Sequence, residues 1–158
     1  MPYAQTTFLN LPVSDLARSI AFYTSLGFVQ NHTFSNSTSA MISLPILTHF
    51  TNPHESPIKI MLLCHDFFES FLPPNKSMAN AKTTAQMIFC ISQESKEAVD
   101  TMVNKAAGSG VDVDIRGRNE AQKKAEQNSG MYIRNFEDPD GHVLEVVYMP
   151  VQCYEGKE

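Results

Sequence analysis

The order of apolar and polar residues in the first half of the chain predicts a strand, a helix and three further strands. Residues 8–13 form a short apolar run typical of a strand, and Ser14 and Asp15 after it can cap a helix by accepting bonds from free backbone amides. From Leu16 apolar residues recur at three- and four-residue steps as far as Gly27, which predicts a helix ending there. Further strands are predicted at residues 28–33, 40–44 and 58–63.

The second half predicts the same order of elements after a linker. Residues 65–71 form a short aromatic helical stretch, and the Pro-Pro-Asn-Lys-Ser sequence that begins at Pro73 is typical of a linker. Residues 85–92 predict a strand, and a helix with one apolar face then runs from about Gln93 to Gly108. Three more strands are predicted at residues 111–115, 131–136 and 143–149. The polar stretch 116–130 between them is expected to be an exposed connector or a lid.

This repetition predicts the fold class. The strand at residues 8–13 and its helix superpose on residues 86–91 and theirs at an offset of 78 residues (86 minus 8). We therefore expect an α+β fold with two βαβββ modules, whose curved mixed sheets surround a central cleft suited to a ligand. Module 1 would span about residues 5–64, the linker 65–83 and module 2 84–150, within one domain of residues 1–158. A ferredoxin-like domain with coincidental periodicity is the alternative.

Composition and charge exclude several partners. The 158 residues include 42% hydrophobic residues, enough for a real core, and 12 basic against 17 acidic residues give a net charge of −5. No basic surface is therefore expected for nucleic acid. No window approaches the ~20 apolar residues of a membrane span, and the first residues do not resemble a signal peptide. The cysteines, Cys64, Cys90 and Cys153, lack metal-site spacing, and Cys90 is expected to be buried. We expect a cytoplasmic protein without nucleic-acid or membrane partners.

Two motifs carry a family resemblance. Residues 11–23 (LPVSDLARSIAFY), closing on Leu26-Gly27-Phe28, and residues 137–146 (EDPDGHVLEV) resemble the opening and closing signatures of the vicinal oxygen chelate superfamily, the glyoxalase, bleomycin resistance and dioxygenase group. The chain is most similar to its predicted lactoylglutathione lyases, whose shared elements fall at residues 61–63, 67–68 and 131–136. The resemblance implies the same two-module fold, a homodimer and a small-molecule ligand. It does not fix an activity, because this fold hosts many.

The resemblance also implies positions for a metal site. The first-strand ligand falls on Phe8, its counterpart in the second module on Gln86, the last-strand carboxylate on Glu145, and the fourth position on Met61, give or take one residue. A divalent ion needs three or four donors, yet Phe8 offers none and Met61 only a thioether. We therefore expect a weak metal site at Glu145 and Gln86, or no metal at all.

The remaining candidates follow from these positions. In a dry cleft Glu145 would be a catalytic general base for a proton beside a carbonyl, or merely a carboxylate bonded to Gln86 or Tyr132. Tyr132 and Arg134 share strand parity and could hold a ligand oxygen, although Arg134 could equally pair with an acidic surface residue. His142, beside Asp140-Gly141, is expected to pack in a turn.

Four hypotheses about function follow. The first is a glyoxalase-like lyase, isomerase or cyclase that acts on a carbonyl compound through Glu145. The second is a non-catalytic protein that sequesters an apolar or aromatic ligand, as the bleomycin-resistance members do. The third is a metal-dependent lactoylglutathione lyase or extradiol dioxygenase, and the fourth is a scaffold without a ligand. In the first two, Phe8, Met61, Gln86, Tyr132 and Arg134 would contact the ligand.

Overall fold

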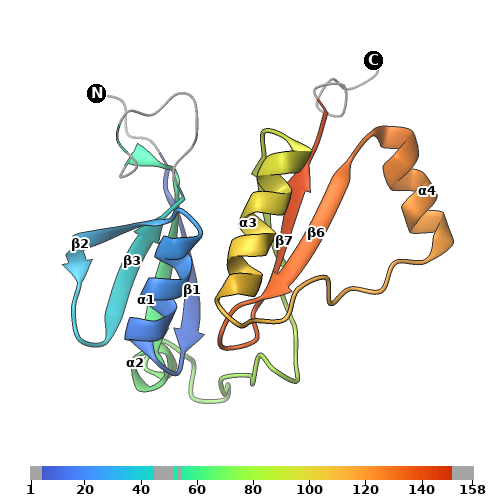
Figure 1. Ribbon diagram of the computed structural model, residues 1–158. Helices are drawn as coiled ribbons and strands as arrows, with labels where there is room; N and C mark the ends of the chain where they lie inside the picture. Colours follow the sequence, from blue (N-terminus) through green and yellow to red (C-terminus); the bar gives the residue numbers. More distant parts are fainter. Residues whose placement is uncertain (1–4, 45–51, 53–54, 151–158) are drawn as a thin grey trace. The chain divides into compact units, whose positions relative to one another are not determined.

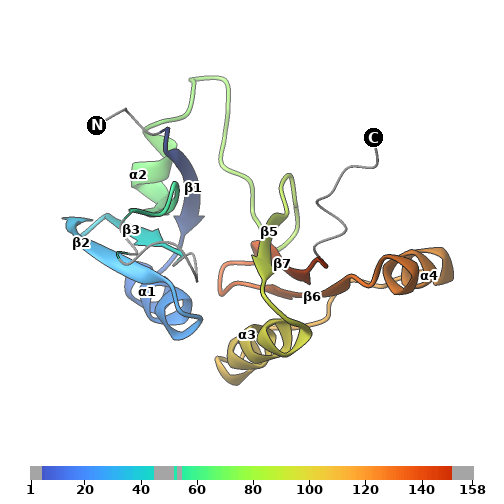
Figure 2. The same ribbon diagram turned by 90° about the horizontal axis from the view of Figure 1, so that it is seen from above.

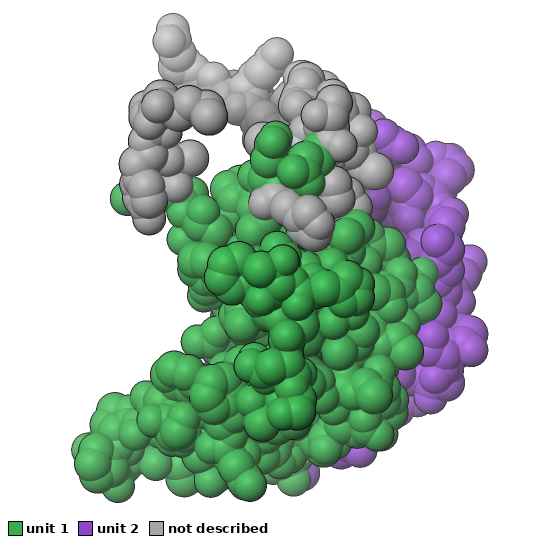
Figure 3. Space-filling model, turned by 90° about the vertical axis from the view of Figure 1, so that its left-hand side faces the viewer, with its two compact units in different colours: residues 1–80 green, residues 81–158 purple. Residues whose placement is uncertain are grey.

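The computed structural model describes residues 5–44, 52 and 55–150, and within them the chain is a mixed α+β protein with two small sheets. It divides into two compact units, residues 1–80 and 81–158, which are coloured separately in Figure 3. Each unit contains one sheet and one principal helix packed on it (Figure 1). The α+β class is as the sequence predicts, and so is the order of strands and helices in the first unit. Cys153 lies outside the described residues.

The first unit contains a four-stranded sheet. Its strands are β1 (Thr7–Val13), β2 (Val29–Ser35), β3 (Ser39–Ser43) and β4 (Ile58–Cys64), in the order β1-β4-β3-β2. β1 and β4 are parallel and the other two pairings are antiparallel. Between β1 and β2 runs α1 (Leu16–Ser25), and α2 (His65–Glu69) follows β4. The predicted strands and helices of this half are therefore confirmed, with boundaries shifted by one or two residues.

Local chemistry explains where α1 begins and which side it covers. The Asp15 carboxylate accepts a hydrogen bond from the Arg18 amide at 3.0 Å, which satisfies a backbone donor at the helix start. Tyr23 on α1 is fully buried and makes an edge-to-face contact with Phe28 at 5.3 Å between ring centroids. The core beneath α1 consists of alternate strand residues that are apolar and almost fully buried: Leu11, Val13, Ala40, Ile42, Ile60 and Leu62.

The second unit contains a three-stranded sheet in the order β5-β7-β6 (Figure 2). The strands are β5 (Phe89–Gln93), β6 (Tyr132–Glu137) and β7 (Val143–Tyr148); β5 and β7 are parallel, and β6 and β7 are antiparallel. α3 (Lys96–Gly108) covers one face, and buries Val99, Met102, Val103 and Ala106 there. At residues 111–115, where a strand was predicted, the structure contains only a single bridge between Val113 and Phe136. The prediction of a fourth strand in this sheet is therefore wrong.

The polar stretch after this bridge folds into a helix. α4 (Glu120–Ser129) begins with a capping box between Asn119 and Gln122 and ends at Gly130 in the left-handed conformation. None of its residues is buried, and it lies beyond the β6 edge of the sheet (Figure 1). Within the described residues no helix is long and apolar enough to cross a membrane.

Candidate functional site

Equivalent positions of the two units can be identified by aligning the residues that cap their principal helices. Asp15 caps α1 and Ser95 caps α3, so the units superpose at an offset of 80 residues (95 minus 15), not the predicted 78. The counterpart of Phe8 is therefore Ile88, and that of Asn10 is Cys90. Asn10 pairs with Met61 on β4, and Cys90 pairs with Glu145 on β7, so Met61 and Glu145 occupy equivalent positions. The structure thus places Met61 and Glu145 at equivalent positions of the two units. The counterpart of Phe8, however, is Ile88 and not Gln86.

Gln86 lies outside the sheet. It is exposed, at a bend three residues before β5 begins at Phe89, and therefore is not the strand neighbour of Glu145. Cys90 takes that place, and it is exposed rather than buried as the sequence predicted. Partial burial of the Cys90 thiol and the charge of Glu145 both raise its pKa, so the surroundings do not activate this thiol as a nucleophile.

Glu145 lies on the face of the second sheet opposite α3, in a row with Cys90 on β5 and Asn135 on β6. Its carboxylate forms an ion pair with Arg116, and its side chain is 15% exposed. Asn135 is buried and accepts a hydrogen bond from the Arg116 amide at 3.2 Å through its side-chain oxygen. Arg116 was not among the predicted site residues, and its separation of 29 residues from Glu145 leaves no local pattern that would reveal it.

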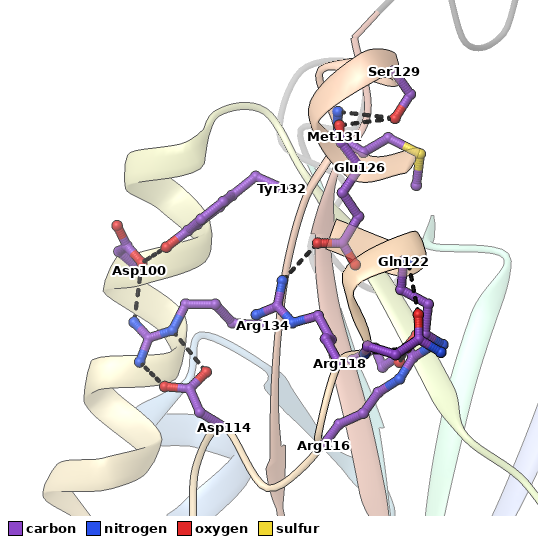
Figure 4. Close-up of polar contacts among 12 residues, drawn as sticks. Asp100, Asp114, Arg116, Arg118, Gln122, Glu126, Ser129, Met131, Tyr132 and Arg134 are labelled. Atoms are coloured by element: carbon purple, nitrogen blue, oxygen red, sulfur yellow. Dashed lines mark hydrogen bonds and ion pairs between the residues drawn. The ribbon is translucent and has the colours of Figure 1, made fainter. Parts of the chain in front are cut away.

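Tyr132 and Arg134 lie on the opposite face of the same sheet. The Tyr132 hydroxyl donates to Asp100 of α3 at 2.8 Å, and Arg134 donates to Asp100 at 3.0 Å and to Asp114 at 2.6 and 3.0 Å (Figure 4). These bonds tie the sheet to α3. Pairing with acidic residues is thus the interpretation of Arg134 that the structure supports, and neither side chain reaches the Glu145 face.

In the first unit, the face of the sheet opposite α1 includes Phe8, Lys59 and Met61. Phe8 is 56% exposed although it lies within β1, and its neighbour on β4 is Lys59. Lys59 is buried and donates to the Ser43 hydroxyl at 3.0 Å, and desolvation lowers the pKa of its ammonium group. Lys59 was not predicted, although a lysine between Ile58 and Ile60 in an apolar strand was a usable signal.

The donors present do not fit a tightly bound divalent metal. Glu145 has one amide and one thiol beside it in the sheet, and its carboxylate is already bound to a guanidinium. At the equivalent position of the first unit Met61 lies between Asn10 and Met41, which adds only amide and thioether donors. Zinc and similar ions require three or four converging histidine, cysteine or carboxylate ligands. Among the described residues no group of three or more such side chains could hold an ion.

Known proteins support the fold. The family model described as "Bleomycin resistance protein-like N-terminal" matches residues 5–45. The comparison with curated proteins found no match. A solved structure of the hypothetical protein SA1046 from S. aureus is 22% identical, with 93% of this chain and 95% of that chain aligned and a TM-score of 0.65.

Two further structures carry functional descriptions. A glyoxalase/bleomycin resistance/dioxygenase family enzyme from Burkholderia phytofirmans PsJN is 16% identical, with 93% and 100% of the chains aligned and a TM-score of 0.64. A bleomycin-binding protein in complex with bleomycin is 15% identical, with 94% and 100% aligned and a TM-score of 0.53. At these identities the likeness concerns the fold. The chain therefore has the fold of the glyoxalase, bleomycin resistance and dioxygenase superfamily, also called vicinal oxygen chelate proteins.

Proposed function

We propose that the protein is a non-catalytic binder of an apolar or aromatic small molecule. The observation that carries this proposal is the exposure of apolar side chains at equivalent positions of the two units. Phe8 is 56% exposed and its counterpart Ile88 is 51% exposed. Leaving a large apolar side chain in water forgoes roughly 1.5–3 kcal/mol of burial free energy. A ligand that covers the exposed side chain of either unit would recover this energy.

The chemistry around Glu145 favours binding over catalysis. A general base must present a free carboxylate oxygen to the proton that it removes. Arg116 binds one oxygen of this carboxylate, and burial and the charge of Glu145 raise the pKa of the neighbouring Cys90 thiol. Among the described residues no cluster of histidine, cysteine or carboxylate side chains could hold a metal ion that would polarise a carbonyl substrate. These features suit a surface that holds a molecule without transforming it.

Binding of the neutral fluorescent dye Nile red tests the proposal. We expect saturable binding by the wild type and a loss of about tenfold in affinity, equivalent to ~1.4 kcal/mol, in Phe8→Ala. Phe34→Ala is the matched control, because Phe34 is also an exposed phenylalanine within a strand of the same sheet. Absence of saturable binding, or equal losses in the two variants, would refute the proposal.

A glyoxalase-like enzyme is the second candidate, and one observation favours it. Glu145 lies inside a sheet face, 15% exposed, where a strand would more commonly carry an apolar residue. In this reading Glu145 removes a proton beside a carbonyl after a substrate displaces Arg116. The test is turnover of methylglyoxal in the presence of glutathione, which is the lactoylglutathione lyase reaction. Turnover by the wild type that disappears in Glu145→Gln would establish this candidate function. Stoichiometric zinc or nickel in protein purified without chelator would point to the metal-dependent form.

Two further expectations belong to this proposal. The protein would form a homodimer and act in the cytoplasm, where a reducing environment keeps Cys64 and Cys90 as the free thiols that the structure contains. Light scattering coupled to size-exclusion chromatography measures the first. A mass equal to one chain across micromolar concentrations would contradict it.

A further inference from the structure

The turn at Asp114 connects the two faces of the second sheet. Asp114 has a φ of 53°, in the left-handed region that a residue with a side chain rarely adopts. Its carboxylate receives a two-pronged contact from Arg134, with Nε to Oδ1 at 3.0 Å and an Nη to Oδ2 at 2.6 Å (Figure 4). Planar contacts of this kind are among the strongest hydrogen-bonded ion pairs in proteins. Arg134 therefore holds the strained residue on the side of the sheet that α3 covers.

Asn135 fixes the chain on either side of this turn. Its carbonyl oxygen accepts from the Asp114 amide at 2.7 Å, and its side-chain oxygen accepts from the Arg116 amide at 3.2 Å. The Asn135 side chain lies beside Glu145, on the face opposite α3. Within two residues the chain thus passes from the Arg134 side to the Glu145 side, and the Arg116 guanidinium meets the Glu145 carboxylate there.

We propose that Arg116 determines the charge preference of the face opposite α3, and that the Asp114–Arg134 pair is the positioning device that keeps Arg116 on Glu145. This inference rests on the proposed function, because it assigns the ligand class. Because Arg116 neutralises the Glu145 carboxylate, the face accepts uncharged ligands and gives no advantage to cations. Without Arg116 the same face would carry an uncompensated negative charge and select cationic molecules.

The size of the effect follows from Coulomb's law. At several ångströms and an effective dielectric constant near that of a protein surface, one uncompensated charge changes the affinity for a singly charged ligand by roughly fivefold or more. A cation is favoured and an anion disfavoured by this amount. The ratio of cation to anion affinity therefore changes on the order of tenfold or more. Arg116 is partly exposed, so screening by salt keeps the change in the affinity ratio close to tenfold.

Cys90 provides a reporter that needs no knowledge of the ligand. Its exposed thiol is the β5 neighbour of Glu145, so charged reagents that reach the thiol experience the local charge. The measurement is the ratio of the rates at which cationic ethylammonium and anionic ethylsulfonate methanethiosulfonates modify Cys90, followed by peptide mass spectrometry. The same Cys90 thiolate attacks both reagents and displaces methanesulfinate from each, so changes in the thiol pKa cancel in the ratio.

The charge half of the proposal predicts a rise of about tenfold in this ratio for Arg116→Ala. Addition of Glu145→Gln to that variant should return the ratio to its wild-type value, and Arg116→Lys should leave it within about twofold. Arg118→Ala is the control, because Arg118 lies in the same segment but pairs with Glu126 of α4 at 2.7 Å. An unchanged ratio in Arg116→Ala, or an equal rise in Arg118→Ala, would overturn the proposal.

The proposed positioning role of the Asp114–Arg134 pair is tested with the same Cys90 modification ratio. Asp114→Asn retains a residue that tolerates the left-handed conformation but removes the charge that Arg134 holds. We expect the ratio to rise severalfold in Asp114→Asn, although neither Asp114 nor Arg134 lies on the Cys90 face. A wild-type ratio in a folded Asp114→Asn protein would refute the positioning role. Because the readout is thiol modification, failure here is distinguishable from failure of Nile red to bind.

Discussion

Tyr132 on β6 and Asp100 on α3 are joined by a hydrogen bond of 2.8 Å from the hydroxyl to the carboxylate. Arg134, two residues along the strand, donates to the same carboxylate oxygen at 3.0 Å. The two strand residues predicted as ligand contacts thus converge on one helix residue instead. Their shared role is to fix α3 on the sheet whose other face carries Glu145.

Removal of the Tyr132 hydroxyl should lower stability in a pH-dependent way. Desolvation and the bond to Asp100 raise the pKa of Tyr132, so the contribution to stability is complete below the unfolded-chain pKa of about 10 and is lost as the pH rises through the folded pKa. Tyr132→Phe should reduce the free energy of unfolding by about 1 kcal/mol at neutral pH. The difference from wild type should vanish in urea titrations at high pH; a constant difference would contradict this cause.

Removal of the Asp114 charge should act at the other end of the pH scale. The hydrogen bond from Arg134 lowers the pKa of the Asp114 carboxyl, so its stabilisation is present above the unfolded-chain pKa of about 4 and is lost as the pH falls through the folded pKa. Because Asp114 is well exposed, we expect Asp114→Asn to cost only about 1 kcal/mol at pH 7. Urea titrations should show the two proteins converging below pH 4, and divergence there would refute the assignment.

The two glycines with φ near 100° should differ in their tolerance of a side chain. Gly27 has a φ of 103° and open space around an added Cβ, whereas Gly141, with a φ of 96°, would place that atom 2.8 Å from the Lys82 backbone. Gly27→Ala should cost about 1 kcal/mol of conformational strain. Gly141→Ala should cost about 3 kcal/mol or more, because backbone must move as well. Equal losses in thermal unfolding would show that the close approach is unimportant.

The helix caps offer a matched test in the two units. Asp15 accepts from the Arg18 amide and Ser95 from the Ala98 amide, each at 3.0 Å. Asp15→Ala and Ser95→Ala should each reduce the free energy of unfolding by about 1 kcal/mol. The double variant should lose the sum, because the caps share no partners. A double variant no less stable than either single variant would contradict independent capping.

The sequence by itself determined the order of elements, because helix and strand periods, caps and glycine stops act over a few residues. Ser14 and Asp15 predict the start of α1, and the second helix is predicted from about Gln93, three residues before α3 begins at Lys96. The motifs flanking these elements also indicated the superfamily fold. The resemblance of residues 137–146 to the closing signature of that superfamily also singled out Glu145 as a candidate site residue.

Only the tertiary structure decided which side chains meet. The start of β5 at Phe89 depends on its partner, β7, which begins at Val143, and this excluded Gln86 and brought in Cys90. A shift of one residue in a strand moves every side chain to the other face, so small errors of register exchange whole sets of neighbours. The contact between Arg116 and Glu145 depends on a left-handed turn and on pairing across 29 residues, which no local pattern encodes.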